Sequence, residues 1–355
     1  MKAAIITFYD AYNYGAFWQA KCLKDFINNI EDVECEILKV ELRKDCLRTL
    51  KQFYYFFSRK ISFQKMRYEI ERYRYFQKFS EKLNPQFMHN IYDVYIFGSD
   101  ELWNIKKKKN RRNRARILWG MGLSDSSRKI SYAPSVNESN EKDFDKLPSF
   151  KENVSKFNSL SARDQKSVDV LENVLGRNVK LVLDPTLLQK PEYFNNYQVM
   201  ESEIERNEYL LLYVYKRLIT EKEINLIKSF SKEKKLKIIS LGDYLNFADE
   251  SILCTPEQFL TYYKNASYVF TNTFHGVMFS IVFRKNFGIL DSHQLKVEEA
   301  ISQFGLGKLR VSDLDNTWNL DNRDMTKIWD DVYETIEKYR IESENYLVEA
   351  INATD

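Results

Sequence analysis

The stretch "SYVFTNTFHGVMFSIVF" (residues 267–283) joins a short apolar run, a polar loop and a longer apolar run. This pattern predicts a buried strand, a short loop and a buried helix. The loop holds His275, one of only three histidines in the chain. Because the first turn of a helix presents backbone N–H groups that favour a phosphate or carboxylate, we interpret His275 as part of an anion site. The structural alternative is a histidine that only stabilises the turn.

The same alternation of strand and helix extends over most of the chain. Nearly continuous Val, Ile, Leu and Phe runs are typical of parallel strands covered by helices on both faces, whose ligands collect at the carboxyl ends of the strands. The sequence therefore predicts an α/β protein. Strands are expected at 2–8, 35–43, 93–98, 128–133, 157–163, 179–184, 209–216, 236–242, 268–273 and 286–290, with helices at 220–233, 255–265 and 274–284 and a long closing helix at 325–351.

The length of 355 residues exceeds that of the usual single domain. We place the boundary near Pro185. The N-terminal domain then covers 1–185, with a helical and basic insertion at 45–116, and the C-terminal domain covers 186–355. Since no Gly/Ser-rich or Pro-rich linker is present, two closely packed Rossmann-like domains with a cleft between them are expected.

The composition narrows the classes of function. A formal net charge of +3 does not favour nucleic-acid binding. The four cysteines are scattered without a CxxC pair, which argues against a zinc site or a disulfide framework and indicates reduced thiols. The apolar N-terminal run is too short for a signal peptide or a membrane span, so a cytoplasmic protein is expected. No metal ligand pattern and no Gly-rich phosphate loop is present, so metal, ATP and nicotinamide chemistries lose support.

Four polar loops are expected near the ends of predicted strands. In the second of them, Ser99 and Asp100 offer oxygen atoms, Asp100 as a proton acceptor, and Trp103 offers a flat apolar face on which a sugar can stack. The alternative is that each loop is an ordinary turn with a polar cap. The loops are "YNYG" (12–15), "GSDELWN" (98–104), "SARD" (161–164) and "NTFHG" (272–276).

Arg163 stands directly before a predicted helix that ends at Gly176. A planar guanidinium at a helix start suits a carboxylate or phosphate. The alternative is a surface ion pair, with Asp164 or another neighbour.

Two segments are rich in basic residues, and the second of them is also rich in aromatic residues. The run at 106–116 holds eight basic residues, and residues 51–79 interleave aromatic and basic side chains. The first is typical of a solvated loop and the second of helices that cover a sheet. The functional alternative is attraction of residues 51–116 to an anionic membrane face or an anionic glycan.

Taken in order, these motifs resemble the polysaccharide pyruvyl transferase family, from residue 4 to about residue 310. The matching stretches are "NYGAFWQAKCLKDFI" (13–27), "YIFGSDELWN" (95–104), "KISYAPS" (129–135), "LSARDQKSVDVLENVLG" (160–176), "VKLVLDPTLL" (179–188) and "TNTFHGVMFSIVFRKNF" (271–287).

The resemblance implies a GT-B-like fold and transfer of pyruvate from phosphoenolpyruvate to two hydroxyls of a sugar, as a ketal, in cell-surface or exopolysaccharide biosynthesis. It implies no metal or further cofactor, and a glycan acceptor that is free or lipid-linked, in the second case at the inner membrane face. Arg163 and His275 fall on positions associated with phosphoenolpyruvate, and Asp100 is the third candidate catalytic residue. Donor-binding candidates are Asn272, Thr273 and Gly276; acceptor-binding candidates are Asn13, Tyr14, Gly15, Ser99, Trp103 and Asn104. The N-terminal domain is expected on the acceptor side, and the C-terminal domain carries the His275 loop.

The sequence departs from the family pattern at several positions. Asn272 and Thr273 stand where relatives often carry an aspartate, a serine or an arginine, and the basic run follows "GSDELWN". Two alternatives therefore stay open: a GT-B nucleotide-sugar glycosyltransferase, and a non-catalytic relative that binds anionic glycan.

Overall fold

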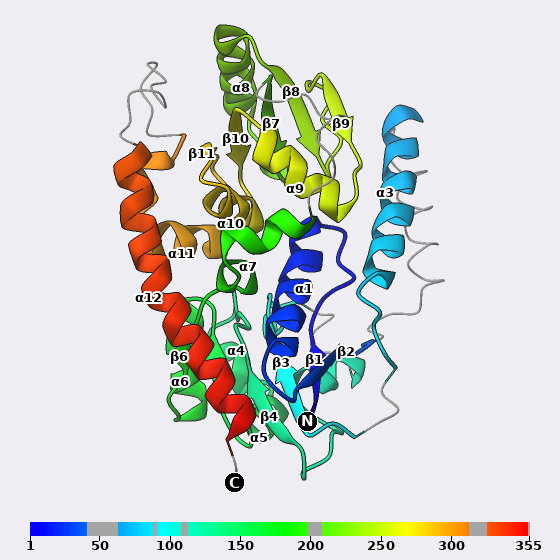
Figure 1. The fold of residues 1–355 in the computed structure, drawn as a ribbon, viewed down its shortest axis with the longest axis vertical. Helices are drawn as coiled ribbons and strands as arrows, with labels where there is room; N and C mark the ends of the chain where they lie inside the picture. Colours follow the sequence, from blue (N-terminus) through cyan, green and yellow to red (C-terminus); the bar gives the residue numbers. More distant parts are fainter. Residues whose placement is uncertain (41–62, 88–90, 108–112, 198–207, 312–324, 354–355) are drawn as a thin grey trace. The chain divides into compact units, whose positions relative to one another are not determined.

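The computed structural model describes residues 1–40, 63–87, 91–107, 113–197, 208–311 and 325–353 (Figure 1). The chain folds into two compact units. Unit 1 comprises Met1–Tyr12, Gln19–Pro185 and Glu342–Asp355, and unit 2 comprises Asn13–Trp18 and Thr186–Ile341. Residues 41–62 and 108–112, which hold much of the predicted insertion and basic run, lie outside the described residues.

The main sheet of unit 1 is parallel, and its strands are apolar because both faces are covered. The strand order is β2-β1-β3-β4, so β2 lies on one side of β1, and β3 and β4 lie on the other. The carboxyl ends of β1 and β3 therefore form a topological switch point. A short parallel pair, β5 and β6, continues from β4. The strands are β1 (Lys2–Ile6), β2 (Glu34–Ile37), β3 (Val94–Phe97), β4 (Arg128–Ser131), β5 (Ser161–Ala162) and β6 (Lys180–Leu181).

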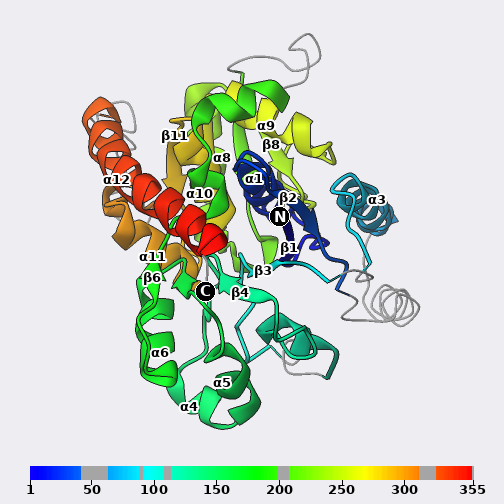
Figure 2. The same cartoon turned by 60° about the horizontal axis from the view of Figure 1, so that its bottom comes forward.

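Helices of unit 1 between residues 141 and 175 bury apolar side chains in one core with β1 and β3. In α6, Asp164 caps the first turn and Gly176 takes a left-handed conformation at the end, which explains both helix limits. Helices α4, α5 and α6 pack together (Figure 2). The helices are α3 (Phe63–Glu81), η2 (Asn113–Trp119), α4 (Glu141–Asp145), α5 (Pro148–Val154) and α6 (Gln165–Leu175), together with α1 (Tyr14–Asn28), whose first turn belongs to unit 2.

The sheet of unit 2 is also parallel and has the order β11-β10-β7-β8-β9. Counted within the unit, this is the 3-2-1-4-5 order of a doubly wound sheet, so the switch point lies between β7 and β10. All five residues of β7 are buried, as both-face coverage requires. The strands are β7 (Tyr209–Tyr213), β8 (Lys237–Leu241), β9 (Glu250–Ile252), β10 (Tyr268–Thr271) and β11 (Asn286–Ile289).

The helices of unit 2 start at well-defined caps. Thr220 and Thr255 each form a reciprocal capping box, and every residue of α10 is buried. The helices are α7 (Pro185–Leu188), η3 (Pro191–Tyr197), η5 (Lys216–Leu218), α8 (Glu221–Lys234), α9 (Pro256–Asn265), α10 (Phe274–Val282), α11 (Leu295–Gln303) and η6 (Gly307–Leu309).

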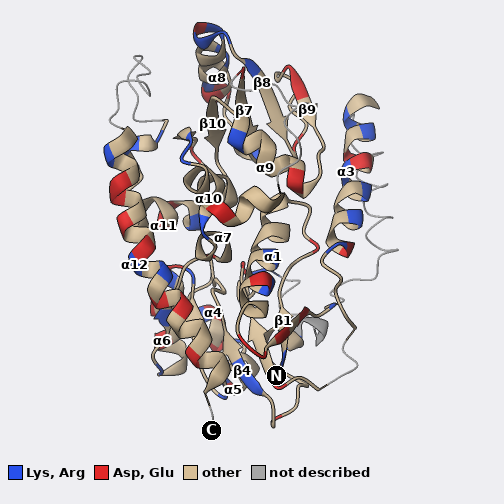
Figure 3. Cartoon of the chain, in the orientation of Figure 1, with Lys and Arg blue, Asp and Glu red and all other residues tan. Residues whose placement is uncertain are grey.

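The closing helix α12 (Met325–Asn352) contributes to both units. In unit 2, the ring of Trp329 stacks on Phe287, and the Tyr333 hydroxyl donates to the Ile281 carbonyl at 2.8 Å. In unit 1, the Leu183 amide donates to the Ser343 hydroxyl at 2.9 Å, and the Tyr346 hydroxyl donates to the Ser131 carbonyl at 2.8 Å. Both acidic and basic residues occur along α12 (Figure 3).

The predicted α/β class, with two Rossmann-like units and a long C-terminal helix, is confirmed. The three-residue strand β9 was not predicted, because its residues are only half-buried and form no apolar run. Within the described ranges, no helix has both the length and the hydropathy needed to cross a membrane.

Candidate active site

His275 lies in the first turn of α10, immediately beyond the carboxyl end of β10. Thr273 is the N-cap of this helix, and its hydroxyl accepts a hydrogen bond from the Gly276 amide at 3.0 Å. Gly276 is required because a Cβ atom there would lie 1.9 Å from the Thr271 hydroxyl oxygen. Only 8% of the His275 surface is exposed. The histidine therefore occupies a fixed place at the switch point of unit 2.

Gly15, in the first turn of α1, lies against the imidazole of His275. A Cβ atom on Gly15 would be 2.2 Å from both Cγ and Nδ1 of the ring. The loops "YNYG" and "NTFHG" are thus brought together within unit 2, although they are far apart in the sequence. Asn13 caps α1, because its Oδ1 accepts from the Ala16 amide at 2.7 Å.

Gly15→Ala is expected to displace the His275 ring and to destabilise the protein by about 1–3 kcal/mol, the usual effect of overpacking a tight contact. The measurement is the thermal unfolding midpoint, together with the NMR chemical shifts of the His275 ring. Gly307→Ala is the matched control, because no atom lies within 4 Å of the added methyl group. Equal midpoints for the two variants would contradict the contact.

The side chain of Asn272 is committed to the backbone of the neighbouring loop. Its Oδ1 accepts from the Tyr215 amide at 2.7 Å, and its Nδ2 donates to the Tyr215 carbonyl at 3.3 Å. Asn272 is completely buried. The amide therefore extends the pairing of β7 with β10 beyond the strands, which requires a donor and an acceptor in one side chain. The donor-binding role of Asn272 stays a prediction.

In unit 1, the loops that follow β3, β4 and β5 are joined edge to edge. The Ser135 amide donates to the Asp100 carbonyl at 2.8 Å, and the Arg163 amide donates to the Pro134 carbonyl at 3.3 Å. These bonds bring the predicted residues Asp100 and Arg163 together at the carboxyl ends of the strands. Ser99 lies beside them and is 1% exposed.

Arg163 forms a buried ion pair with Asp184, which follows β6. Nη1 of Arg163 lies 3.0 Å from Oδ2 of Asp184, and both side chains are at most 2% exposed. Burial alone would lower the pKa of the guanidinium, but the negative charges of Asp184, Asp100 and Asp164 outweigh it, so the pKa of Arg163 is raised. The surface ion pair considered from the sequence is wrong, since this pair is buried.

Two predicted acceptor residues of unit 1 belong to its core. The ring of Trp103 is fully buried against Phe150 and Phe157, and its Nε1 donates to the Leu118 carbonyl at 2.9 Å. Asn104 is also fully buried, and its side chain bonds to Glu101 and to the Ser139 hydroxyl. Both side chains are therefore held inside unit 1. Their predicted contacts with a sugar stay predictions.

Tyr14 is a core residue of unit 2. Its ring stacks on Phe259 with centroids 4.6 Å apart, and its hydroxyl accepts from the Cys254 amide at 3.1 Å. The residue is 1% exposed. Its predicted contact with a sugar stays a prediction. Burial raises the pKa of the Cys254 thiol to about 12, which keeps it protonated and unreactive near neutral pH.

Sequence reasoning did not single out Asp184, the partner of Arg163, or Gln19, whose Nε2 donates to Thr7 Oγ1 at 3.2 Å and to the Phe8 carbonyl at 3.3 Å. Asp184 could have been found, because the apolar run at 179–183 predicts a strand that ends directly before it. Gln19 carried no such signal, since it lies within a helix among apolar neighbours.

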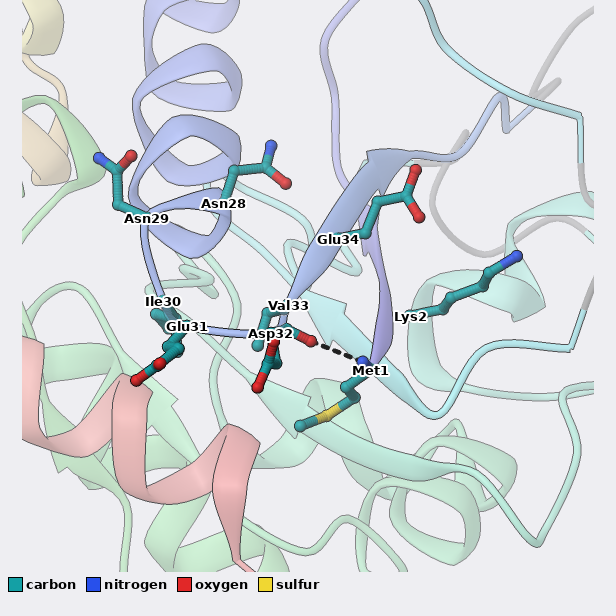
Figure 4. A pocket seen from close by; sticks show the side chains of 9 residues that line it. All are labelled: Met1, Lys2, Asn28, Asn29, Ile30, Glu31, Asp32, Val33 and Glu34. Carbon is teal, nitrogen blue, oxygen red and sulfur yellow. Dashed lines mark hydrogen bonds between the residues drawn. The ribbon is translucent and has the colours of Figure 1, made fainter.

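A hollow on unit 1 lies at the opposite end of its sheet (Figure 4). It is lined by the residues that begin β1 and β2, and the Met1 amino group donates there to the Asp32 carbonyl at 2.6 Å. Parallel sheets bind ligands at the carboxyl ends of their strands, so we assign no activity to this hollow. No cluster of three or more metal-ligating side chains occurs among the residues that the structure describes.

Two doubly wound sheets with polar loops at their switch points define the chain as an α/β protein of the kind that binds ligands at strand carboxyl ends. A family model described as polysaccharide pyruvyl transferase matches residues 13–294, which is well over half of the chain. The chain belongs to the polysaccharide pyruvyl transferase family. A search of curated proteins gives no match.

Several solved structures are similar over nearly the whole chain. A UDP-GlcNAc 2-epimerase from Neisseria meningitidis, bound to UDP-GlcNAc, is 11% identical, with a TM-score of 0.46 and coverage of 99% of this chain and 97% of the other. The epimerase from Methanocaldococcus jannaschii, in complex with UDP-GlcNAc and UDP, is 14% identical, with a TM-score of 0.44 and coverage of 96% and 94%. An alpha-glucosyltransferase in complex with UDP and DNA is 11% identical, with a TM-score of 0.47 and coverage of 98% and 95%. Because the identities are low and the TM-scores lie below 0.5, we infer nothing about the site from these structures.

Proposed function

We propose that the protein transfers pyruvate from phosphoenolpyruvate to two hydroxyls of a glycan, forming a cyclic ketal. The observation that carries the proposal is the placement of His275 in the first turn of α10, at the switch point of unit 2, in a chain of this family. Anionic ligands are stabilised at helix N-termini, and doubly wound sheets bind ligands at switch points. Phosphoenolpyruvate, with a carboxylate and a phosphate, matches such a site, and no further cofactor is invoked.

The proposed reaction forms two C–O bonds at the central carbon of the donor. The donor's methylene carbon gains a proton, the C–O bond to phosphate breaks, and phosphate leaves with the second hydroxyl proton. His275 acts on the donor, either as the general acid or as a ligand of the leaving phosphate. Asp100, half-buried and close to Arg163, is the proposed proton acceptor for the sugar hydroxyl.

The surroundings of Arg163 favour a role other than the donor binding that the family resemblance implies. Its guanidinium already forms a buried pair with Asp184 and lies close to two further carboxylates. A dianionic donor would have to compete with these charges. We therefore propose that Arg163 chiefly orders the loops after β5 and β6, and that the donor binds on unit 2.

The test is incubation of the protein with phosphoenolpyruvate and a panel of free and lipid-linked glycans, the latter on anionic vesicles. We expect phosphate release that depends on the acceptor, and a product whose mass has increased by one pyruvate ketal. Turnover or binding of a nucleotide sugar, but not of phosphoenolpyruvate, would identify a glycosyltransferase instead. Salt-sensitive glycan binding without any turnover would identify the non-catalytic alternative.

The vesicle arm of this assay also tests membrane contact. On α3, Phe63 is 74% exposed and Tyr75 is 41% exposed, and the basic residues Arg74 and Lys78 are exposed as well. Both signs of charge occur along this helix (Figure 3), which weakens its attraction to anionic lipid. We propose that the protein contacts the membrane peripherally only when its acceptor is lipid-linked.

A further inference from the structure

Polar side chains join the loop that carries His275 to the loops on both sides of it in unit 2. In the sheet, β10 lies between β11 and β7, so the loops that follow those two strands flank the loop after β10. On the β7 side, the Asn272 amide binds the backbone of Tyr215. On the β11 side, Nε2 of Gln294 donates to the Asn272 carbonyl at 2.9 Å. The His275 loop is therefore held from both sides.

Glu223, in the first turn of α8, connects the two flanking loops to each other. Its Oε2 accepts from the amide and from the hydroxyl of Thr220, both at 2.8 Å, within the capping box that starts α8. Its Oε1 accepts from the Asp291 amide, shortly after β11, at 2.8 Å. Glu223 is 8% exposed. A buried carboxylate needs hydrogen bonds to both oxygens, and these donors supply them.

Together these hydrogen bonds close a circuit, which we call the loop circuit. It consists of the bonds from Asn272 to Tyr215, from Glu223 to Asp291 and from Gln294 to Asn272, and of the chain segments 215–223 and 291–294 between them. Every link in the loop circuit is either covalent chain or a hydrogen bond. A shift of the His275 loop therefore breaks at least one of these bonds.

The loop circuit ends next to the helix that carries the imidazole. Asn272 stands directly before Thr273, the N-cap of α10, and His275 lies in the first turn of this helix. A displacement of Asn272 therefore displaces the His275 ring. A misplacement of about 1 Å can lower the rate of a reaction about 10²-fold, because reacting groups must be aligned closely.

We propose that Glu223 and Gln294 are positioning residues, which act on the reaction by holding the His275 loop in place. This inference rests on the proposed function, in which His275 acts on the donor. The side chain of His293, in the same loop as Gln294, is exposed and lies outside the loop circuit.

The first test is structural and does not require pyruvyl transfer. The chain has three histidines, so selective isotope labelling gives few imidazole NMR signals. Those of His275 are assigned by their loss in His275→Ala. We expect them to shift in Glu223→Ala and in Gln294→Met, whose side chain has a similar length but cannot donate. Unchanged His275 signals in both variants would overturn the proposal.

Asp143→Ala is the matched control for Glu223→Ala. Asp143 closes the capping box of α4 in unit 1, where its Oδ2 accepts from the Asn140 amide at 3.0 Å. The substitution therefore weakens a helix cap without removing a bond of the loop circuit. The His275 signals should stay as in the wild type. Shifts as large as those in Glu223→Ala would indicate general destabilisation and reject the positioning role.

The second test is a double-mutant cycle on acceptor-dependent phosphate release. Gln294→Met is expected to lower kcat about 3-fold to 10-fold, the effect of one lost hydrogen bond, with little change in KM for the glycan. Because Gln294 acts through His275, the same substitution should have no further effect in His275→Ala.

The cycle separates positioning from direct contact. An equal loss of activity in both backgrounds would show that Gln294 contacts the substrate itself, which contradicts the proposal. If the wild type releases no phosphate with any acceptor, the proposed function fails. Shifted His275 signals in the two variants, with unchanged signals in the control, would then still support the loop circuit.

Discussion

His275→Ala is expected to lower kcat for phosphoenolpyruvate-dependent ketal formation by about 10²–10⁴-fold, the usual contribution of a positioned acid or base. The fold should persist, because the caps of α10 come from Thr273 and not from the imidazole. Steady-state phosphate release in the presence of acceptor measures the effect, with circular dichroism to check the fold.

His293 supplies the control for this prediction. It is highly exposed, with its Nδ1 3.4 Å from an Asp291 carboxylate oxygen, so His293→Ala should retain wild-type turnover. His275→Gln separates the two proposed roles, since glutamine can hold a phosphate but cannot deliver a proton. Partial activity in this variant supports the phosphate ligand, and full activity in His275→Ala rejects the assignment of His275.

Arg163→Met is expected to destabilise the protein by about 3–5 kcal/mol, because it leaves the buried carboxylate of Asp184 without its cation. For a unit of this size, the loss corresponds to a fall of about 6–20 °C in the thermal midpoint. Thermal unfolding followed by circular dichroism measures it.

The double variant Arg163→Met/Asp184→Leu should recover at least half of this loss, since apolar side chains of similar volume often replace a buried ion pair at little cost. Lys180→Met is the control: it breaks an exposed pair with Glu342 in the same unit and should cost less than about 1 kcal/mol. An Arg163→Met midpoint as high as that of the control would show that the buried pair contributes little.

The double variant also tests what Arg163 does in catalysis. If the guanidinium only orders the loops, the refolded double variant should retain most of its turnover. A stable double variant that has lost affinity for phosphoenolpyruvate would instead show that Arg163 binds the donor, as the family resemblance implies.

Most strands and helices could be predicted from the sequence, because their signals are local. The run "YLLLY" at β7 and the fully apolar face of α10 specify buried elements through residue type and spacing alone. The order of these elements along the chain then restricts the topology, since parallel strands need helical crossovers. Short, half-buried β9 gave no comparable signal.

The site was only partly predictable. The sequence identified His275 and Asp100 as polar residues beyond apolar strands, which is where the structure has them. It did not reveal that the rings of Trp103 and Tyr14 are buried, because an aromatic residue in a polar loop has the same sequence pattern whether its ring faces solvent or the core. It also gave no sign of the bonds that hold the Asn272 side chain, since these are made with the backbone of Tyr215, in the loop that follows β7.

The sequence by itself determined the α/β class, the strands and the loops in which polar residues follow them, because hydrophobic periodicity acts over a few neighbouring residues. The tertiary structure alone decided that Arg163 pairs with Asp184, that Gly15 makes room for His275, and that Trp103 is buried. These outcomes depend on which segments the packed strands bring together, and that proximity depends on contacts between residues far apart in the chain.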